Sequence, residues 1–118
     1  MLLAANILTG IVALLHVYFL VLEMFLWDTP TGLRIFRMTP EKAAASKTLA
    51  MNQGLYNGFL AAGLTWGMWL GPAGNPIRIF FLACVVMAGI FGAATVSKRI
   101  LYIQALPAGL AMALILFG

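Results

Sequence analysis

Four long runs of apolar residues dominate this sequence, and their length limits what the chain can fold into. The runs cover about residues 4–27, 48–70, 77–96 and 100–117. A helix that crosses a bilayer needs about 20 apolar residues. These runs are too long for strands and lack the alternation of barrel strands, so they favour helices. We therefore predict an all-α, integral membrane, antiparallel four-helix bundle, with residues 1–118 forming a single transmembrane domain.

Composition excludes the main soluble classes. Charged residues are 8% of the 118 residues and hydrophobic residues are 64%, whereas a soluble domain carries about 25% charged residues. So few charges cannot cover a water-facing surface, which excludes a soluble enzyme, a disordered tail and a disulfide scaffold. Cys84 is the only cysteine and His16 the only histidine. We therefore expect no disulfide, no cofactor, no bound metal and no nucleic-acid partner.

The basic residues predict the orientation. Arg78 stands alone beside the second connection, and the other six basic residues lie in or beside the first connection (residues 28–47) and the third connection. Positive charge favours the cytoplasmic side, so both of these connections should be cytoplasmic and both termini external. The first run lacks a basic leader and a cleavage site, which predicts a retained span. The six residues are Arg34, Arg37, Lys42, Lys47, Lys98 and Arg99.

Two local signals predict helix boundaries and bends. Thr39 followed by Pro40 is typical of a helix start, with Thr39 as the N-cap and Pro40 at the first helical position. We expect this helix to begin near Pro40 and to enter the membrane near Lys47. Pro107 lies inside the last apolar run, where it predicts a kink or a tightly packed bend.

Two ionisable residues interrupt the first run. Glu23 lies about one turn inside the cytoplasmic end, and His16 lies two turns further along the same face, which also carries Trp27. An ionisable side chain within a bilayer costs roughly 2.5–3.5 kcal/mol, so each one needs an explanation. Glu23 is either part of a functional site or a structural carboxyl group that bonds a neighbouring helix or reaches the interface. His16 alone is also explained as a packing residue.

The second run opens with polar residues on one helical stripe, which meets the stripe of the first run. Antiparallel geometry places Asn52 at the level of Glu23 and Asn57 near the level of His16. Lys98 and Tyr102, four residues apart, face the same zone from the third connection. We predict a ligand site on the cytoplasmic side, and the alternative is interhelical hydrogen bonding. Its candidate residues are His16, Glu23, Trp27, Asn52, Gln53, Tyr56, Asn57, Lys98 and Tyr102.

Small residues form two stripes on the second helix. One stripe holds Gly54, Gly58 and Ala62, and the other holds Gly63-xxx-Gly67-xxx-Gly71. Such stripes let helices approach closely. We expect one stripe to receive a neighbouring helix, and the other to receive a second neighbour or a second copy of the chain in a homodimer.

The string Asn52-Gln53-Gly54-Leu55-Tyr56-Asn57-Gly58, with His16 and the segment at residues 22–27, resembles a known family. It is the group of small bacterial integral membrane proteins called domain-of-unknown-function family thirteen-zero-four. The likeness covers essentially the whole chain. It implies four helices in the bacterial inner membrane and no established activity. The signature residues that it implies are His16, Glu23, Trp27, Asn52, Gln53, Gly54, Tyr56, Asn57 and Gly58. A likeness to small multidrug transporters is superficial, because the strings around Glu23 differ and the charge bias opposes dual topology.

Three functions remain open at this point. The first is binding of a small polar or amphipathic molecule from the cytoplasm or inner leaflet, with proton-coupled transport through Glu23 as its most concrete form; the apolar external half of the spans opposes a complete path. The second is an intramembrane enzyme, such as an isomerase of a lipid-like substrate, with His16 and Glu23 as the catalytic candidates. Two turns separate them by about 10.5 Å of helix rise, too far for a direct hydrogen bond. The third is an accessory subunit with a structural polar cluster.

Overall fold

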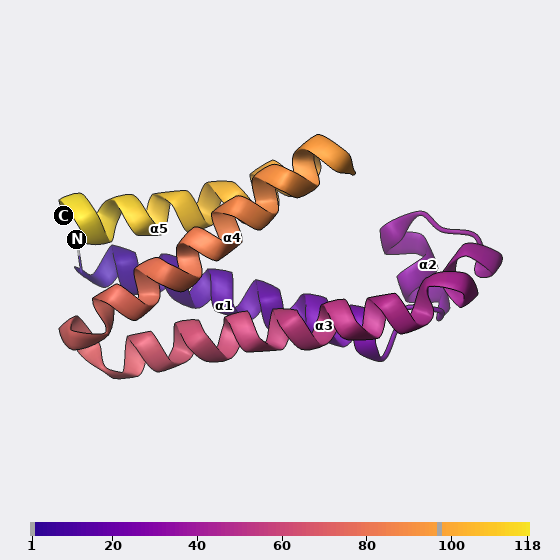
Figure 1. The fold of residues 1–118 in the computed structure, drawn as a ribbon, viewed down its shortest axis with the longest axis horizontal. Coiled ribbons are helices and arrows are strands. Elements are labelled where there is room, and N and C mark those ends of the chain that lie inside the picture. The colour runs from indigo at the N-terminus through magenta and orange to yellow at the C-terminus, as the bar shows by residue number, and fades with distance from the viewer. Residues whose placement is uncertain (1, 97) are drawn as a thin grey trace. The chain divides into compact units, whose positions relative to one another are not determined.

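The structure is a computed structural model that describes residues 2–96 and 98–118, and it is almost entirely helical (Figure 1). No strand occurs in these residues, which confirms the predicted all-α class. Contacts divide the chain into unit 1 (Met1–Leu14 and Leu60–Gly118) and unit 2 (Leu15–Phe59), which we describe separately. The helices are α1 (Leu2–Met24), α2 (Pro30–Phe36), α3 (Pro40–Trp69), α4 (Asn75–Thr95) and α5 (Leu106–Phe117).

Unit 2 contains the second half of α1, all of α2 and the first half of α3. The backbone N–H of Lys42 donates to the Thr39 hydroxyl oxygen at 3.2 Å, and α3 begins at Pro40, so the predicted helix start is confirmed. The short helix α2 was not predicted, although Thr29 caps it in the same way, accepting a hydrogen bond from the Gly32 N–H.

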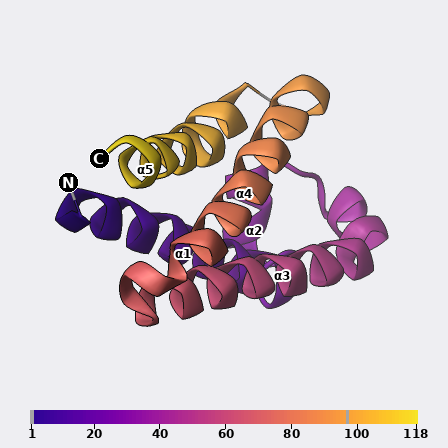
Figure 2. The same cartoon turned by 60° about the vertical axis from the view of Figure 1, so that its left-hand side comes forward.

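Unit 1 combines the start of α1, the end of α3, and all of α4 and α5, with α5 running back along α4 (Figure 2). All four helices contribute to one apolar core. Small residues on α5 allow this close packing, because alanine occupies the two fully buried α5 positions of the core. The core residues are Val12, Ala13, Leu64, Leu82, Val85, Ala108 and Ala111.

Helical geometry changes immediately before Pro107. A π-helical turn covers Leu101–Ala105 and passes directly into α5. Proline lacks an N–H and its ring collides with the carbonyl group four residues earlier, here that of Ile103. Widening of the preceding turn accommodates the ring, since inserted π turns are a common source of helix irregularity. The irregularity predicted at Pro107 is thus a π-helical turn.

Two helical segments of the described chain are long and apolar enough to cross a membrane: Leu3–Met24 and Gly71–Thr95. Leu101–Phe117 is apolar but shorter. The helix α3 is longer than any of these, but it begins in the charged connection and carries polar residues such as Asn52 and Asn57. Length and composition therefore support membrane association through two helices.

Candidate functional site

Within unit 2, glycines bring α3 close to α1. A Cβ atom placed on Gly54 would lie 2.5 Å from Cγ of Met24 and 3.3 Å from the Leu20 carbonyl oxygen. A Cβ atom on Gly58 would lie 2.7 Å from Cδ1 of Leu20. A larger residue at Gly54 would crowd both side-chain and backbone atoms of α1, whereas at Gly58 it would have to displace the end of the Leu20 side chain. The first glycine stripe therefore receives a neighbouring helix of the same chain, as predicted.

This close approach brings Glu23 and Asn57 together. The side-chain amide of Asn57 donates a hydrogen bond to Oε1 of Glu23, across the α1–α3 contact. Asn57 is only 4% exposed, while Glu23 is half-buried. A hydrogen bond to a carboxylate offsets part of the cost of removing it from water. The pair is thus a polar contact between two helices whose other contacts are largely apolar.

The helix register differs from the prediction. We expected Asn52 at the level of Glu23 and Asn57 at the level of His16, but Asn57 is the residue that reaches Glu23. The prediction counted residues up to Trp27 as helical, whereas α1 ends at Met24. The backbone hydrogen bonds from Phe25 to Val21 and from Leu26 to Leu22 continue the helical pattern past Met24, so the end of α1 does not by itself account for the difference.

Among the described residues, no hydrogen bond joins the other polar residues of the second run to Glu23. Asn52, Gln53 and Tyr56 are exposed, and Tyr56 is 61% exposed with its ring against that of Phe59. His16 is fully buried, and its ring meets the ring of Phe19 edge-on, with the centroids 5.6 Å apart. Of the candidates in unit 2, the structure joins Glu23 and Asn57 directly.

Trp27 links the connection between α1 and α3 to the start of α3. Its indole N–H donates to the Ser46 hydroxyl oxygen at 3.1 Å, and its ring packs against that of Phe36 with 4.7 Å between centroids. Lys47 donates to Asp28 at 3.0 Å, and this hydrogen bond lowers the pKa of Asp28 from its ordinary value of 3.8. The connection is therefore tied to the start of α3 through Trp27 and Lys47.

The two candidates from the third connection belong to unit 1. Lys98 lies in a turn after α4 and Tyr102 lies in the π-helical turn, and both side chains are exposed. Among the described residues, no three His, Cys, Asp or Glu side chains come together in a way that could hold a metal ion. The chemistry that this arrangement offers is hydrogen bonding and proton exchange at one carboxyl group.

The second glycine stripe lies in unit 1 and receives α4. A Cβ atom on Gly63 would lie 2.4 Å from the Phe81 ring, and one on Gly67 would lie 2.6 Å from Cγ of Arg78. Arg78 itself is 1% exposed, although the sequence placed it beside a connection. Its guanidinium group donates to the Thr9 hydroxyl oxygen at 2.9 Å. The sequence interpretation missed this buried polar pair, and the only signal for it was a threonine within an apolar run.

Comparison with known proteins shows the family. A family model described as "Protein of unknown function (DUF1304)" matches residues 10–116. The "Uncharacterized protein YpaA" of Lactococcus lactis subsp. lactis (strain IL1403) is 33% identical over 100 residues, which cover 83% of this chain and 84% of that protein. No solved structure matches. The chain therefore belongs to the DUF1304 family, as its resemblance suggested.

Proposed function

We propose that this chain is an integral membrane protein that crosses the membrane four times. The support comes from how little of the two apolar segments is buried. Only 28% of the apolar window in Leu3–Met24 and 22% of that in Gly71–Thr95 is buried. An apolar helix at the core of a soluble protein would be mostly buried. These side chains face outward, where a lipid environment is the solvent that they suit.

The helices α3 and α5 supply the other two spans. Trp69 and Phe117 are each 87% exposed, and Leu49 is 72% exposed, so both helices present large apolar side chains outward. The basic residues place the connection between α1 and α3 on the cytoplasmic side of a bacterial inner membrane. In this orientation the contact between Glu23 and Asn57 lies in the cytoplasmic half of the membrane.

The function that this geometry supports best is binding of a small amphipathic molecule at Glu23. The hydrogen bond from Asn57 to Glu23 carries the proposal, because it holds a carboxyl group at a defined point on an otherwise apolar helix contact. Asn57 uses one oxygen of the carboxyl group, and a carboxylate has about four acceptor positions. A ligand with an N–H or ammonium end would use the remainder, while its apolar part would lie among the surrounding side chains.

Proton-coupled transport is the concrete form of this function. A carboxyl group in a medium of low dielectric constant exchanges a proton for a cationic ligand, since either one neutralises its charge. Asn57 suits both states, because its amide donates to the charged form and its carbonyl oxygen accepts from the protonated form. His16 lies two turns deeper on α1 and is the other ionisable residue that interrupts the first apolar run.

A structural role is the second candidate, and one observation favours it. Asn52, Gln53 and Tyr56 are exposed, and no hydrogen bond joins them to Glu23 within the described residues. A pair that consists of Glu23 and Asn57 alone is what interhelical hydrogen bonding requires, at about 0.6 kcal/mol per bond in a membrane. In that case the chain is an accessory or assembly subunit.

Purified protein reconstituted in vesicles distinguishes the two candidates. An imposed pH gradient is followed with a pH-sensitive dye in the lumen while a series of primary, tertiary and quaternary amines is added outside. Transport predicts amine-dependent proton movement with wild-type protein and none with Glu23→Gln. Glu41→Gln is the matched control, because Glu41 is exposed at the start of α3. A structural role predicts no amine-dependent movement, together with loss of thermal stability in Glu23→Gln and Asn57→Ala.

A further inference from the structure

Two residues that the sequence singled out, Lys98 and Tyr102, lie in unit 1 and take no part in the function proposed at Glu23. Tyr102 lines an open apolar groove of about 310 Å³ between α4 and the chain that follows the third connection. Clefts that bind ligands measure roughly 300–1,000 Å³. The groove is lined by Val86, Ile90, Leu101, Tyr102, Ala105 and Leu106.

The groove runs along the helices. Its walls contain residues four apart on each side, Val86 and Ile90 on α4 and Tyr102 and Leu106 on the facing segment, and such residues share a helix face. Ile90 and Leu106 are 53% and 52% exposed, so both walls are open to the surroundings. In the four-span arrangement these walls would face lipid. An acyl chain fits along them, because spanning helices are tilted by only about 20° on average from the membrane normal.

Close packing fixes the shape of the groove. A Cβ atom on Gly89 would lie 2.8 Å from the backbone N of Ala105, and one on Gly92 would lie 2.9 Å from Cγ2 of Ile100. Small residues of this kind let helices approach closely. Ala105, which lines the groove, is itself only 7% exposed. The two segments are therefore in contact at the base of the groove, and the groove is a feature of the folded unit.

Two basic residues lie at the end of the groove nearest the third connection. The backbone N–H of Leu101, which lines the groove, donates to the Lys98 carbonyl oxygen at 3.1 Å, so Lys98 lies within one turn of the groove. Arg99 follows it, and both side chains are exposed. None of residues 1–14 or 60–118 is Asp or Glu, so unit 1 adds no acidic side chain to balance these two charges. This end of the groove therefore favours an anion.

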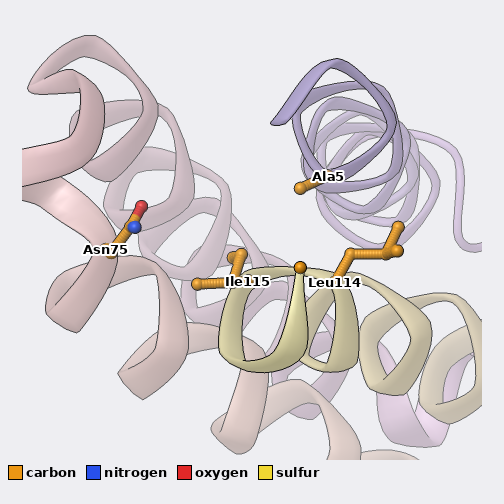
Figure 3. Close-up of a pocket in the computed structure, with 5 residues that line it drawn as sticks. Ala5, Asn75, Leu114 and Ile115 are labelled. Carbon is orange, nitrogen blue, oxygen red and sulfur yellow. The ribbon is translucent and has the colours of Figure 1, made fainter. Parts of the chain in front are cut away.

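A second cavity in unit 1, of about 210 Å³, lacks an accessible charge. Figure 3 shows Asn75, the first residue of α4, on one side of this space and Leu114 on another, and no lining side chain is charged. The basic residue nearest to it on α4, Arg78, is 1% exposed and donates to the Thr9 hydroxyl oxygen. Lys98, by contrast, is exposed. Of the two cavities, the groove is thus the one that combines an apolar surface with an accessible positive charge.

We propose that the groove binds one acyl chain of an anionic phospholipid of the cytoplasmic leaflet, with the phosphate of its headgroup beside Lys98 and Arg99. Basic pockets at the cytoplasmic ends of spanning helices suit such headgroups. Tyr102, which is 66% exposed, adds a hydroxyl donor near the same level, and tyrosine side chains favour the interface. The site rests on the four-span topology proposed above, and it is independent of a ligand at Glu23.

Native mass spectrometry of the detergent-solubilised full chain measures this site. The protein is titrated with phosphatidylglycerol and, separately, with phosphatidylcholine that has the same acyl chains, and the dissociation constants of the first bound lipid are compared. Each basic residue near an anionic headgroup strengthens binding roughly fivefold, so wild type should bind phosphatidylglycerol more tightly by about that factor or more. Equal affinities for the two lipids would overturn the proposal.

Variants connect the preference to the groove. Lys98→Gln should reduce the preference for phosphatidylglycerol by about fivefold. Lys42→Gln is the matched control, because Lys42 is also exposed but lies in unit 2. Ile90→Ala combined with Leu106→Ala removes part of both walls and should weaken binding of both lipids several-fold. Phe91→Ala is the control for this pair, since Phe91 is 71% exposed on α4 and does not line the groove.

The proposal requires both the charge and the groove. A preference that survives in Lys98→Gln, or a double alanine variant that binds phosphatidylglycerol as wild type does, would overturn it. Flotation with phosphatidylcholine vesicles separates this failure from failure of the proposed topology. Wild type that does not float contradicts the spans and the lipid site together, whereas wild type that floats but shows no headgroup preference contradicts the lipid site alone.

Discussion

Asn57 of α3 donates a hydrogen bond to Glu23 of α1, at a point where two glycines of α3 let the helices approach. Among the described residues, Asn57 is the only asparagine whose side chain bonds a carboxyl group. It lies 34 residues from Glu23 in the sequence. Gly54, three residues before Asn57, leaves the space that α1 fills with Met24. The polar pair and the close helix contact therefore depend on each other, and each can be tested.

Removal of the Asn57 amide should destabilise the protein. Asn57→Ala leaves Glu23 half-buried without this donor, and we expect a loss of about 0.6–1.7 kcal/mol, the range for interhelical hydrogen bonds in membranes. Asn52→Ala is the matched control, because Asn52 is exposed on the same helix and should change stability by less than about 0.5 kcal/mol. Thermal unfolding of the purified variants in one detergent measures both. Equal losses at the two positions would contradict the hydrogen bond to Glu23.

The fit of Gly54 against α1 should not tolerate a methyl group. A Cβ atom there would lie 2.5 Å from Cγ of Met24, so Gly54→Ala should force the helices apart and cost about 1–3 kcal/mol. Gly109→Ala, on α5, is the control, because a Cβ atom there meets nothing within 4 Å. Alanine is also the better helix former, so this control should be neutral or stabilising. Unfolding in detergent decides, and a neutral Gly54→Ala would show that the helices are not closely packed.

The pair Asp28–Lys47 should make the connection sensitive to acid. The hydrogen bond from Lys47 holds the pKa of Asp28 below 3.8, so its contribution to stability is present above that pH. It is lost as the pH falls through the lowered value, because the unfolded chain binds the proton more tightly. NMR titration of the Asp28 carboxyl carbon in micelles should give a higher midpoint in Lys47→Gln than in wild type. An unchanged midpoint would show that the exposed pair does not form in solution.

Cysteine labelling tests the orientation in the membrane. In a Cys84→Ala background, Ala44→Cys lies in the first turns of α3 and Ala73→Cys lies in the turn between α3 and α4, and both positions are exposed. In intact cells, a membrane-impermeant thiol reagent should label Ala73→Cys and leave Ala44→Cys unlabelled until the membrane is opened. Labelling of both positions in intact cells would overturn the four-span topology.

Local sequence signals predict a helix start well when the interactions that cause it involve only neighbouring residues. Thr39 and Pro40 predicted the start of α3, since a cap and a proline act on the adjacent backbone alone. The same pair occurs at Thr29 and Pro30, where α2 begins. This signal was overlooked because the segment that follows is short and lies within the polar first connection. Helix α2 lacks the length on which an apolar pattern can be read, so its cap was the available sequence signal, and the helix was not predicted.

The sequence predicted the residue types of the candidate site, but it predicted the register between α1 and α3 less well. Glu23 and Asn57 were both expected at a polar site, yet the register between α1 and α3 makes Asn57, and not Asn52, the asparagine that reaches the carboxyl group. One helical stripe also covers a wide arc, so Asn52 and Tyr56 belong to it in sequence and are exposed in the structure. Arg78 could not be found from the sequence, because its burial follows from Gly67 and Thr9 on two other helices.

The most direct test of the central claim is whether a small molecule is retained at Glu23. Native mass spectrometry of protein purified in a mild detergent measures retained ligands by mass. We predict a co-purifying amphipathic molecule on wild type and Glu41→Gln, and its loss from Glu23→Gln that is still folded by circular dichroism. Wild type without any such molecule, or Glu23→Gln with the same molecule at the same occupancy, would contradict a ligand site at the Glu23–Asn57 pair.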